Sequence, residues 1–331
     1  MKKILVIFGI LFVLAFLFKD EANNLFTGKA VSDETDEKVM PQDFGNIYVY
    51  FCPLDDCEGI LVREIENSNN VDCAFFDLNL DGVINVLKNK NYRLIVDDSN
   101  SKKVDLDNIV VDNRNGLMHN KFCVLDDFKV ITGSMNPTEF DAKRNNNNLI
   151  IIESRSLVEN YMDEFEEMWN GVFGGGEETR YSKVLFNGYL IENYFCPEDE
   201  CEEQVLKVLR DARSRIYFMT FSFTSDKIGE EIVRNFYHGI DIRGVFEKTQ
   251  AGSEYSEYHR FNDFEMDVKL DSNKGMMHHK VFIVDDIVIF GSYNPTKSGD
   301  EVNDENVLIF HSIEIAEKFI GEFERLYEES K

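Results

Sequence analysis

Short, strongly apolar runs alternate with amphipathic stretches along most of the chain, and the same order of runs occurs twice. The predicted strands are residues 46–51, 71–78, 92–98 and 148–154 in the first copy, and 189–195, 215–224, 241–247 and 306–312 in the second. Residues 158–170 and 316–329 have apolar positions at helical spacing and predict a closing helix for each copy. Apolar strands between helices indicate sheets covered on both faces. We predict an α/β fold of two halves, each a mixed sheet flanked by helices, packed as a pseudo-two-fold dimer.

The first 44 residues do not follow this pattern. Residues 4–18 are an uninterrupted apolar run, and Lys2 and Lys3 precede it. A short apolar run with a basic flank predicts a membrane anchor helix or a signal segment over residues 1–19, with its N-terminus in the cytoplasm. Residues 20–44 are acidic and predict a flexible linker. We expect a single-pass cell-membrane protein whose folded part faces outside, or a secreted protein if the segment is cleaved.

The duplication sets the remaining boundaries. The first half covers residues 45–173, a glycine-containing linker covers residues 174–184, and the second half covers residues 185–331. Residues 247–264 of the second half form a polar insert with aromatic residues that the first half lacks. We expect this insert to line a substrate groove.

The cysteines support an exported domain. Cys52 and Cys57 form a C-x4-C pattern that recurs at Cys196 and Cys201. In an oxidising compartment each pattern can close as a local disulfide. The alternatives are four thiolates on one zinc ion, or free thiols near two helix starts. Two further cysteines, Cys73 and Cys123, lie in strand-like runs and are expected to be ordinary core residues.

A polar motif is also repeated, and core packing does not account for it. The first copy contains His119, Lys121, Asp126, Ser134 and Asn136. Its counterparts in the second copy are His278, Lys280, Asp285, Ser292 and Asn294. A His and a Lys two residues apart on a strand project from the same face. If the copies meet, two imidazoles, two ammonium groups and two amides surround one point.

Such a group suits a phosphodiester. Lysine, serine and asparagine side chains can hold the non-bridging oxygens, one neutral imidazole can attack phosphorus, and the other can protonate the leaving oxygen. This chemistry needs no metal ion and no other cofactor, and no cluster of carboxylates for Mg²⁺ accompanies the motif.

With these residues the chain resembles the phospholipase D superfamily, whose signature is H-x-K-x4-D followed by G-S-x-N. Both copies match, and the surrounding sequence is similar to the small nuclease-like branch of that family. The resemblance implies metal-independent cleavage in two steps through a phosphohistidine. Where that branch usually has a serine before the proline, this chain has Cys52 and Cys196, which strengthens the disulfide prediction.

The two copies differ after the motif, where Glu305 aligns with Asn147. In the family an acidic residue near this position orients the catalytic histidine. A carboxylate stabilises an imidazolium more than an amide does. We therefore predict that Glu305 supports His278 as the general acid and that His119 is the nucleophile. Asp126 and Asp285 are candidate catalytic residues or, equally, structural anchors at strand ends.

Three functions are considered. The first is a membrane-anchored nuclease outside the cytoplasm, with Arg114, Arg144, Lys274 and Lys297 as local contacts to DNA or RNA. The net charge of −27 opposes a broad nucleic-acid surface. The alternative is a phospholipase D or phosphatidyltransferase that acts on membrane phospholipids. A catalytically silent binding domain is the third. Because both half-sites lie in one chain, we expect a monomer to suffice.

Overall fold

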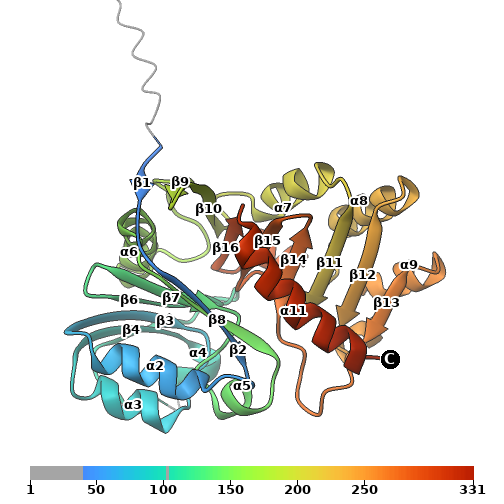
Figure 1. Ribbon diagram of the computed structural model, residues 1–331. Helices are drawn as coiled ribbons and strands as arrows, with labels where there is room; N and C mark the ends of the chain where they lie inside the picture. Colours follow the sequence, from blue (N-terminus) through green and yellow to red (C-terminus); the bar gives the residue numbers. More distant parts are fainter. Residues whose placement is uncertain (1–39, 102–103) are drawn as a thin grey trace, which may run out of the picture. The chain divides into compact units, whose positions relative to one another are not determined.

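The computed structural model describes residues 40–101 and 104–331 (Figure 1). The predicted anchor or signal segment, residues 1–19, and most of the predicted acidic linker lie outside the described residues. Across residues 40–101 and 104–331, no helix is both long enough and apolar enough to cross a membrane.

The first half consists of one sheet and its helices. Its strands are β2 (Ile47–Cys52), β3 (Asn70–Phe75), β4 (Asn91–Asp97), β5 (Ile109–Asp112), β6 (Lys121–Leu125), β7 (Lys129–Gly133) and β8 (Asn147–Ile152). Its helices are α2 (Cys57–Glu66), α3 (Asp81–Leu87), α4 (Asp98–Ser101), α5 (Glu139–Lys143) and α6 (Arg155–Trp169). The predicted strands and the closing helix are all present within a few residues of their expected bounds.

The second half repeats this order. Its strands are β9 (Lys183–Phe186), β10 (Tyr189–Cys196), β11 (Arg215–Thr220), β12 (Asp241–Phe246), β13 (Asp267–Leu270), β14 (Lys280–Val284), β15 (Ile287–Gly291) and β16 (Glu305–Phe310). Its helices are α7 (Cys201–Arg210), α8 (Asp226–Tyr237), η1 (Gln250–Gly252), α9 (Glu257–Asp263), α10 (Lys297–Glu301) and α11 (Ile313–Glu329). The insert that the first half lacks forms η1 and α9.

The two sheets have the same strand order. The first runs β2-β8-β7-β6-β3-β4-β5, and the second runs β10-β16-β15-β14-β11-β12-β13 with β9 and β1 added at one edge. In each sheet the strands on one side pair antiparallel and the last three pair in parallel. The central strands β6, β8, β14 and β16 are buried along their whole length. This confirms the predicted α/β fold with two mixed sheets in duplicated halves.

Three hydrophobic clusters hold these layers together. One lies between the first sheet and α2 and α3, and a second lies between the second sheet and α7, α8 and α9 (Figure 1). The largest cluster contains residues of both halves, including α6 and α11. In it Tyr161 packs edge-on against Phe195 of the other half, and Phe51 packs in the same way against Phe319. Burial of aromatic surface therefore joins the halves into one core.

The short strand β1 (Gln42–Asp43) lies within the segment that was expected to be linker. It pairs in parallel with β9, so the entry to the first half adds a strand to the sheet of the second. Asp43 also accepts hydrogen bonds from Ser154 and Ser156 at the start of α6. The folded part thus begins earlier than the acidic composition suggested, because Asp43 caps a helix.

The expectation that Cys73 and Cys123 are ordinary core residues was wrong. Both are buried, but they form a disulfide between the adjacent strands β3 and β6. Their Cα atoms are 4.1 Å apart, since the antiparallel register places the two residues directly opposite each other. The sequence pattern located each strand but not the pairing of the strands.

Candidate active site

The two histidines of the repeated motif lie where the halves meet. The backbone N–H of His119 donates to the carbonyl of Asp304 at 3.0 Å, and that of His278 donates to the carbonyl of Asn146 at 2.9 Å. Each bridge joins the histidine, two residues before its motif strand, to the residue before the last strand of the other half. These reciprocal contacts bring both His-Lys pairs to one place, as the repeated motif predicted.

His119 contacts a carboxylate of the other half. Its Nδ1 lies 2.7 Å from Oε2 of Glu305, and both side chains are buried. Glu305 was expected to support His278, so this part of the prediction was wrong. The alignment correctly marked Glu305 as a histidine partner, but the crossed packing of the halves gives it the histidine of the opposite copy.

His278 has a different environment. Its Nδ1 lies 2.9 Å from Oδ1 of Asn147 and 3.5 Å from Oδ2 of Asp141. Nδ2 of Asn147 donates to the carbonyls of Asp141 and Asn145, which fixes the amide with its oxygen toward the ring. Nδ1 of His278 therefore carries the proton, and Nε2 keeps its lone pair.

The two lysines are held in the same way in both halves. Nζ of Lys121 donates to the carbonyl of His119 at 2.5 Å, and Nζ of Lys280 donates to the carbonyl of His278 at 2.8 Å. Lys121 lies over the ring of Phe76, and Lys280 lies over the ring of Phe221. Burial lowers the pKa of Lys121 to about 8 and lowers the pKa of Lys280 well below its usual range. An anion that enters would restore the charged form of both.

The electrostatics distinguish the two histidines. Burial first, and then the charges of Lys121 and Lys280, lower the pKa of both imidazoles well below the usual range. Burial also raises the pKa of Glu305 to about 8. At neutral pH the His119–Glu305 pair therefore retains one shared proton, and the ring keeps an N–H on Nε2. His278 has no such partner and is neutral.

The Gly-Ser segment holds the last strand of each half in sequence, β8 or β16, in place. Gly133 and Gly291 have positive φ, and a Cβ at either position would meet the backbone oxygen of Asn148 or Asn306 at 2.4 or 2.2 Å. Ser134 Oγ accepts the N–H of Asn148, and Ser292 Oγ accepts that of Asn306. The two serines, predicted to bind phosphate, are thus engaged in aligning strands β8 and β16.

The motif asparagines lie closer to the reacting groups. Nδ2 of Asn136 donates to Asp141, which faces His278. The side-chain oxygens of Asn136 and Asn294 are buried and have no hydrogen-bond partner among the described residues. Their predicted contact with phosphate stays a prediction.

Asp126 and Asp285 lie at the far ends of strands β6 and β14 from the histidines. Asp126 accepts the N–H groups of Asn69 and Asn70, and Asp285 accepts those of residues 213–215. These bonds hold the start of the neighbouring strand, β3 or β11, against the end of the motif strand. Of the two alternatives, the structure supports structural anchors at strand ends rather than catalytic residues.

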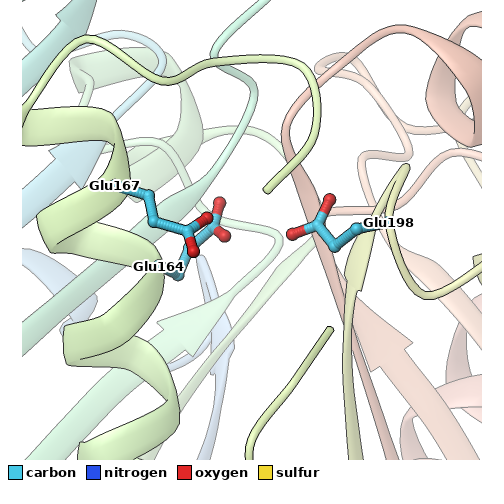
Figure 2. A group of neighbouring side chains, drawn as sticks. All are labelled: Glu164, Glu167 and Glu198. Atoms are coloured by element: carbon cyan, nitrogen blue, oxygen red, sulfur yellow. The ribbon is translucent and has the colours of Figure 1, made fainter. Parts of the chain in front are cut away.

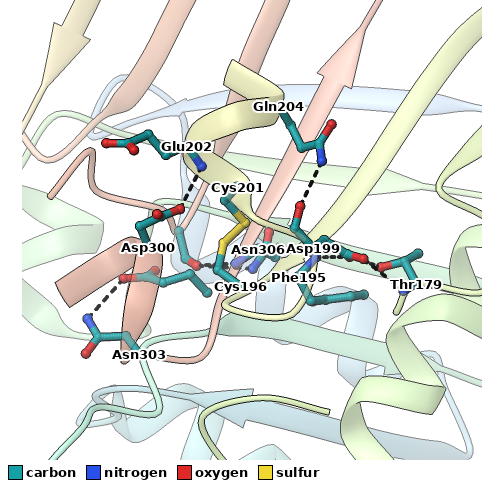
Figure 3. Close-up of a disulfide and its surroundings, with 12 residues drawn as sticks. Thr179, Phe195, Cys196, Asp199, Cys201, Glu202, Gln204, Asp300, Asn303 and Asn306 are labelled. Atoms are coloured by element: carbon teal, nitrogen blue, oxygen red, sulfur yellow. Dashed lines mark hydrogen bonds between the residues drawn. A yellow bond between two sulfur atoms is a disulfide. The ribbon is translucent and has the colours of Figure 1, made fainter. Parts of the chain in front are cut away.

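The duplicated cysteine pattern has a role next to the site. Disulfides Cys52–Cys57 and Cys196–Cys201 are both present, as predicted. In the sheet register Cys196 lies opposite Glu305, and Cys52 lies opposite Asn147. Figure 3 shows the Cys196–Cys201 loop, where Asp300 accepts the N–H of Glu202. Each disulfide therefore stiffens the strand end that lies beside a histidine partner.

Three carboxyl groups form a separate cluster that the sequence did not indicate. Glu164 and Glu167 project from α6 toward Glu198 of the second half, close enough to share one ion (Figure 2). Burial raises the pKa of Glu164 and raises that of Glu198 to about 7, and the two groups hydrogen-bond to each other. The cluster is joined to the motif through Asn120, whose amide donates to Glu164. Raised pKa values favour protonation of these groups, which reduces the repulsion among the three carboxyl groups.

Several residues near the site were missed because they lie outside the signature. Phe76 and Phe221 pack edge-on against His119 and His278 with ring centroids 4.8 and 4.9 Å apart. His279, between the motif His and Lys, points the other way and contacts Asn148 and Glu322. Comparing the two copies could have found the phenylalanines, since each lies within the corresponding predicted strand of its half.

Comparisons with known proteins agree with this geometry. The family model described as "Cardiolipin synthase, PLD-like domain" matches residues 58–169 and 205–327, one segment in each half. The chain is 27% identical over 131 residues to a phospholipase D of Rickettsia conorii, covering 39% of this chain and 66% of that protein. It is 32% identical over 127 residues to a mitochondrial cardiolipin hydrolase of Mus musculus, covering 38% and 58%. The chain thus spans less than two thirds of the length of these relatives.

A solved structure shows the same fold. The phosphatidylserine synthase of Haemophilus influenzae aligns with a TM-score of 0.65 at 11% identity, over 86% of this chain and 87% of that one. The phospholipase D family member Nuc of Salmonella typhimurium aligns with a TM-score of 0.41 at 25% identity, over 43% and 95%. The names of the two sequence relatives, a phospholipase D and a cardiolipin hydrolase, agree with the expected enzyme class, a phosphodiester hydrolase. With a family match in both halves and the paired motifs at their interface, the chain belongs to the phospholipase D superfamily.

Proposed function

We propose that this protein is a metal-independent phosphodiesterase that works through a phosphohistidine. The observation that carries the proposal is the meeting of two buried His-Lys pairs, one from each half, with a carboxylate hydrogen-bonded to only one ring. Two imidazoles in different protonation states supply a nucleophile and an acid in one site. The lysines supply the positive charge that a phosphoryl group needs.

In the first step Nε2 of His278 attacks phosphorus, because its ring is neutral and Asn147 holds the proton on Nδ1. The new P–N bond forms as the bond from phosphorus to the leaving oxygen breaks. His119 gives its Nε2 proton to that oxygen, and Glu305 keeps the Nδ1 side of the ring in place. These roles are the reverse of the sequence-based prediction, since they follow the observed position of Glu305.

In the second step the now neutral His119 takes a proton from water. The resulting hydroxide attacks phosphorus, the P–N bond breaks, and His278 returns to its neutral form. Lys121 and Lys280 flank the histidines from opposite halves, so both can contact the non-bridging oxygens in either step. An alcohol in place of water would make the same site a transferase.

For the substrate we favour a phospholipid. The net charge of −27 repels nucleic acid, whose binding depends largely on phosphate neutralisation. Arg114, expected to contact nucleic acid, is paired with Asp112 and Asp304. Phe140 and Met276 are exposed within two residues of Asp141 and His278. The sequence relatives named above are a phospholipase D and a cardiolipin hydrolase.

The nuclease prediction remains the second candidate. Arg144 and Lys274 are exposed on segments that lead into the site, where Asn273 donates to the carbonyl of Arg144. Two cations near the entrance could guide a single strand of DNA or RNA even on an acidic protein.

The location is proposed from the cysteines and the apolar run of residues 4–18. All six cysteines form disulfides, which persist in oxidising compartments. We therefore place the folded part outside the cytoplasm, held to the cell membrane by the N-terminal run, or secreted if that run is cleaved. One chain supplies both half-sites, so we expect a monomer to be active.

The test uses the full chain in EDTA with four substrates: phosphatidylcholine vesicles, cardiolipin vesicles, single-stranded DNA and RNA. We expect head-group release from vesicles, and loss of at least about 10²–10⁴-fold in His119→Ala and in His278→Ala. Cleavage of nucleic acid alone, abolished in both variants, would assign the nuclease function instead. Activity that survives either substitution would contradict the proposed chemistry.

A further inference from the structure

The two histidines differ in the residue and the element that supply a nearby carboxylate. Glu305 occupies the position at the start of β16 and touches His119 directly. The matching residue at the start of β8 is Asn147, which is neutral. His278 would thus lack a carboxylate if the chain followed the same plan in both halves.

Asp141 of α5 lies at the place where that charge is needed. Its Oδ2 is 3.5 Å from Nδ1 of His278, on the same side of the ring as Asn147. Asp141 is buried, and it accepts from the backbone and side-chain amides of Asn136 and from Nδ2 of Asn145. Although burial opposes it, these hydrogen bonds help to keep the pKa of Asp141 below its usual range, so it is ionised.

The second half provides an internal comparison. The residue that matches Asp141 is Gly299, in α10. A Cβ at Gly299 would meet the backbone oxygen of Asn294 at 2.4 Å, so this half has no room for a side chain there. One half has Glu in the strand and Gly in the helix, and the other has Asn in the strand and Asp in the helix.

We propose that Asp141 is a positioning residue for His278 that replaces the carboxylate missing at Asn147. Asn147 accepts the Nδ1 proton and fixes the tautomer, while Asp141 supplies the negative charge behind it. When phosphorus bonds to Nε2, the ring becomes cationic, and Asp141 stabilises that charge. This inference rests on the proposed function and deepens it, because it assigns the second carboxylate of the site.

The other groups with the largest effect on the charge of His278 oppose Asp141. Lys280, Lys121 of the other half and His119 each disfavour a positive ring, whereas Asp141 favours it. Phe221 contributes an uncharged contact. Removing the charge of Asp141 should therefore lower the pKa of His278.

The kinetic test compares Asp141→Asn, Asn147→Glu and the double variant with the wild type. We expect Asp141→Asn to lower kcat about tenfold with little change in KM. A decrease of one unit in the pKa of His278 corresponds to a tenfold weaker stabilisation of its cationic form. Asn147→Glu in the same chain should restore most of kcat, since it returns a carboxylate to the ring. Glu139→Gln, an exposed carboxylate of the same helix, is the matched control and should have no effect.

A purely structural role predicts a different result. Asp141 also holds Asn136, and a loss through that contact would not be rescued by a carboxylate at position 147. Unchanged thermal unfolding in Asp141→Asn together with no rescue in the double variant would overturn the proposal.

A second measurement separates this proposal from the proposed function. Nuclear magnetic resonance of the histidine rings gives the pKa of His278 whether or not a substrate is known. We expect Asp141→Asn to lower it by roughly one unit, and Glu305→Gln to leave it unchanged. An unaltered pKa in Asp141→Asn would refute the role of Asp141 even in an active phosphodiesterase, and inactivity toward all four substrates would refute only the function.

Discussion

At the scale of single residues, the site is two copies of one arrangement with unequal electrostatics. Both histidines are buried, flanked by phenylalanine and followed by a lysine bonded to the histidine carbonyl. Only His119 touches a carboxylate at hydrogen-bond distance. The proton shared with Glu305 makes His119 the better acid, and its absence leaves His278 the better nucleophile.

The roles can be separated by trapping the intermediate. His119→Asn should still allow attack by His278 when the substrate has a good leaving group, but it removes the base of the second step. We expect the phosphoryl group of the substrate, still carrying its second ester, to accumulate on His278 and to be lost in acid, as mass spectrometry of peptides would show. The His278→Asn protein is the control and should carry no adduct. An adduct on His119 in the wild type would restore the sequence-based assignment.

At the scale of elements, disulfides join parts of the sheet that carry the site. Cys52–Cys57 and Cys196–Cys201 each close a separation of only 5 residues, and Cys73–Cys123 closes one of 50. The longer loop loses more freedom in the unfolded chain when it is closed. Cys73–Cys123 therefore contributes mainly to stability, whereas the short loops mainly hold the ends of β2 and β10 beside Asn147 and Glu305.

Stability measurements can test this division. Chain-entropy reasoning gives about 4 kcal/mol for a loop of the length of Cys73–Cys123 and about 2 kcal/mol for Cys196–Cys201. We expect Cys73→Ala/Cys123→Ala to lower the free energy of unfolding by more than Cys196→Ala/Cys201→Ala does, in denaturant titrations without reductant. The second pair should instead lower kcat, because Cys196 lies opposite Glu305. Equal effects of the two pairs on both quantities would contradict the division.

At the scale of the whole molecule, polar groups as well as the shared apolar core join the halves. Arg114 of the first half pairs with Asp304 of the second, and Glu164 of α6 bonds to Glu198. Burial raises the pKa of Asp304 and of Glu198 to about 7. Acidic groups with raised pKa values bind more protons in the folded than in the unfolded state, so they favour folding at low pH.

The stability of the folded chain should therefore depend on pH. The contribution of Glu198 is present below its unfolded pKa of about 4.5 and is lost as pH rises through about 7. We expect Glu198→Gln to raise the melting temperature at pH 8 and to have little effect at pH 5, measured by calorimetry. Glu328→Gln, an exposed carboxylate, should change neither value. A melting temperature that falls at pH 8 in Glu198→Gln would show that the ionised cluster is stabilising, for example through a bound cation.

The sequence predicted the parts of the fold that depend on local pattern. Strand and helix positions were predicted correctly because apolar periodicity and short apolar runs are local features of the sequence. The His-Lys pairs were found because the same motif occurs twice at matching places, and two unrelated packing needs would not reproduce it. The short cysteine loops were also accessible, since both partners lie within one local segment.

The features that the sequence did not predict depend on which surfaces of the folded chain are in contact. The register of β3 and β6 pairs Cys73 with Cys123, and the crossed packing of the halves gives Glu305 to His119. The same packing brings Glu164, Glu167 and Glu198 together and places Asp141 beside His278. The sequence by itself determined the duplicated α/β order and the reacting side chains, because these are local or repeated patterns. The tertiary structure alone decided which acid supports which histidine, because contacts between distant segments follow from packing in three dimensions.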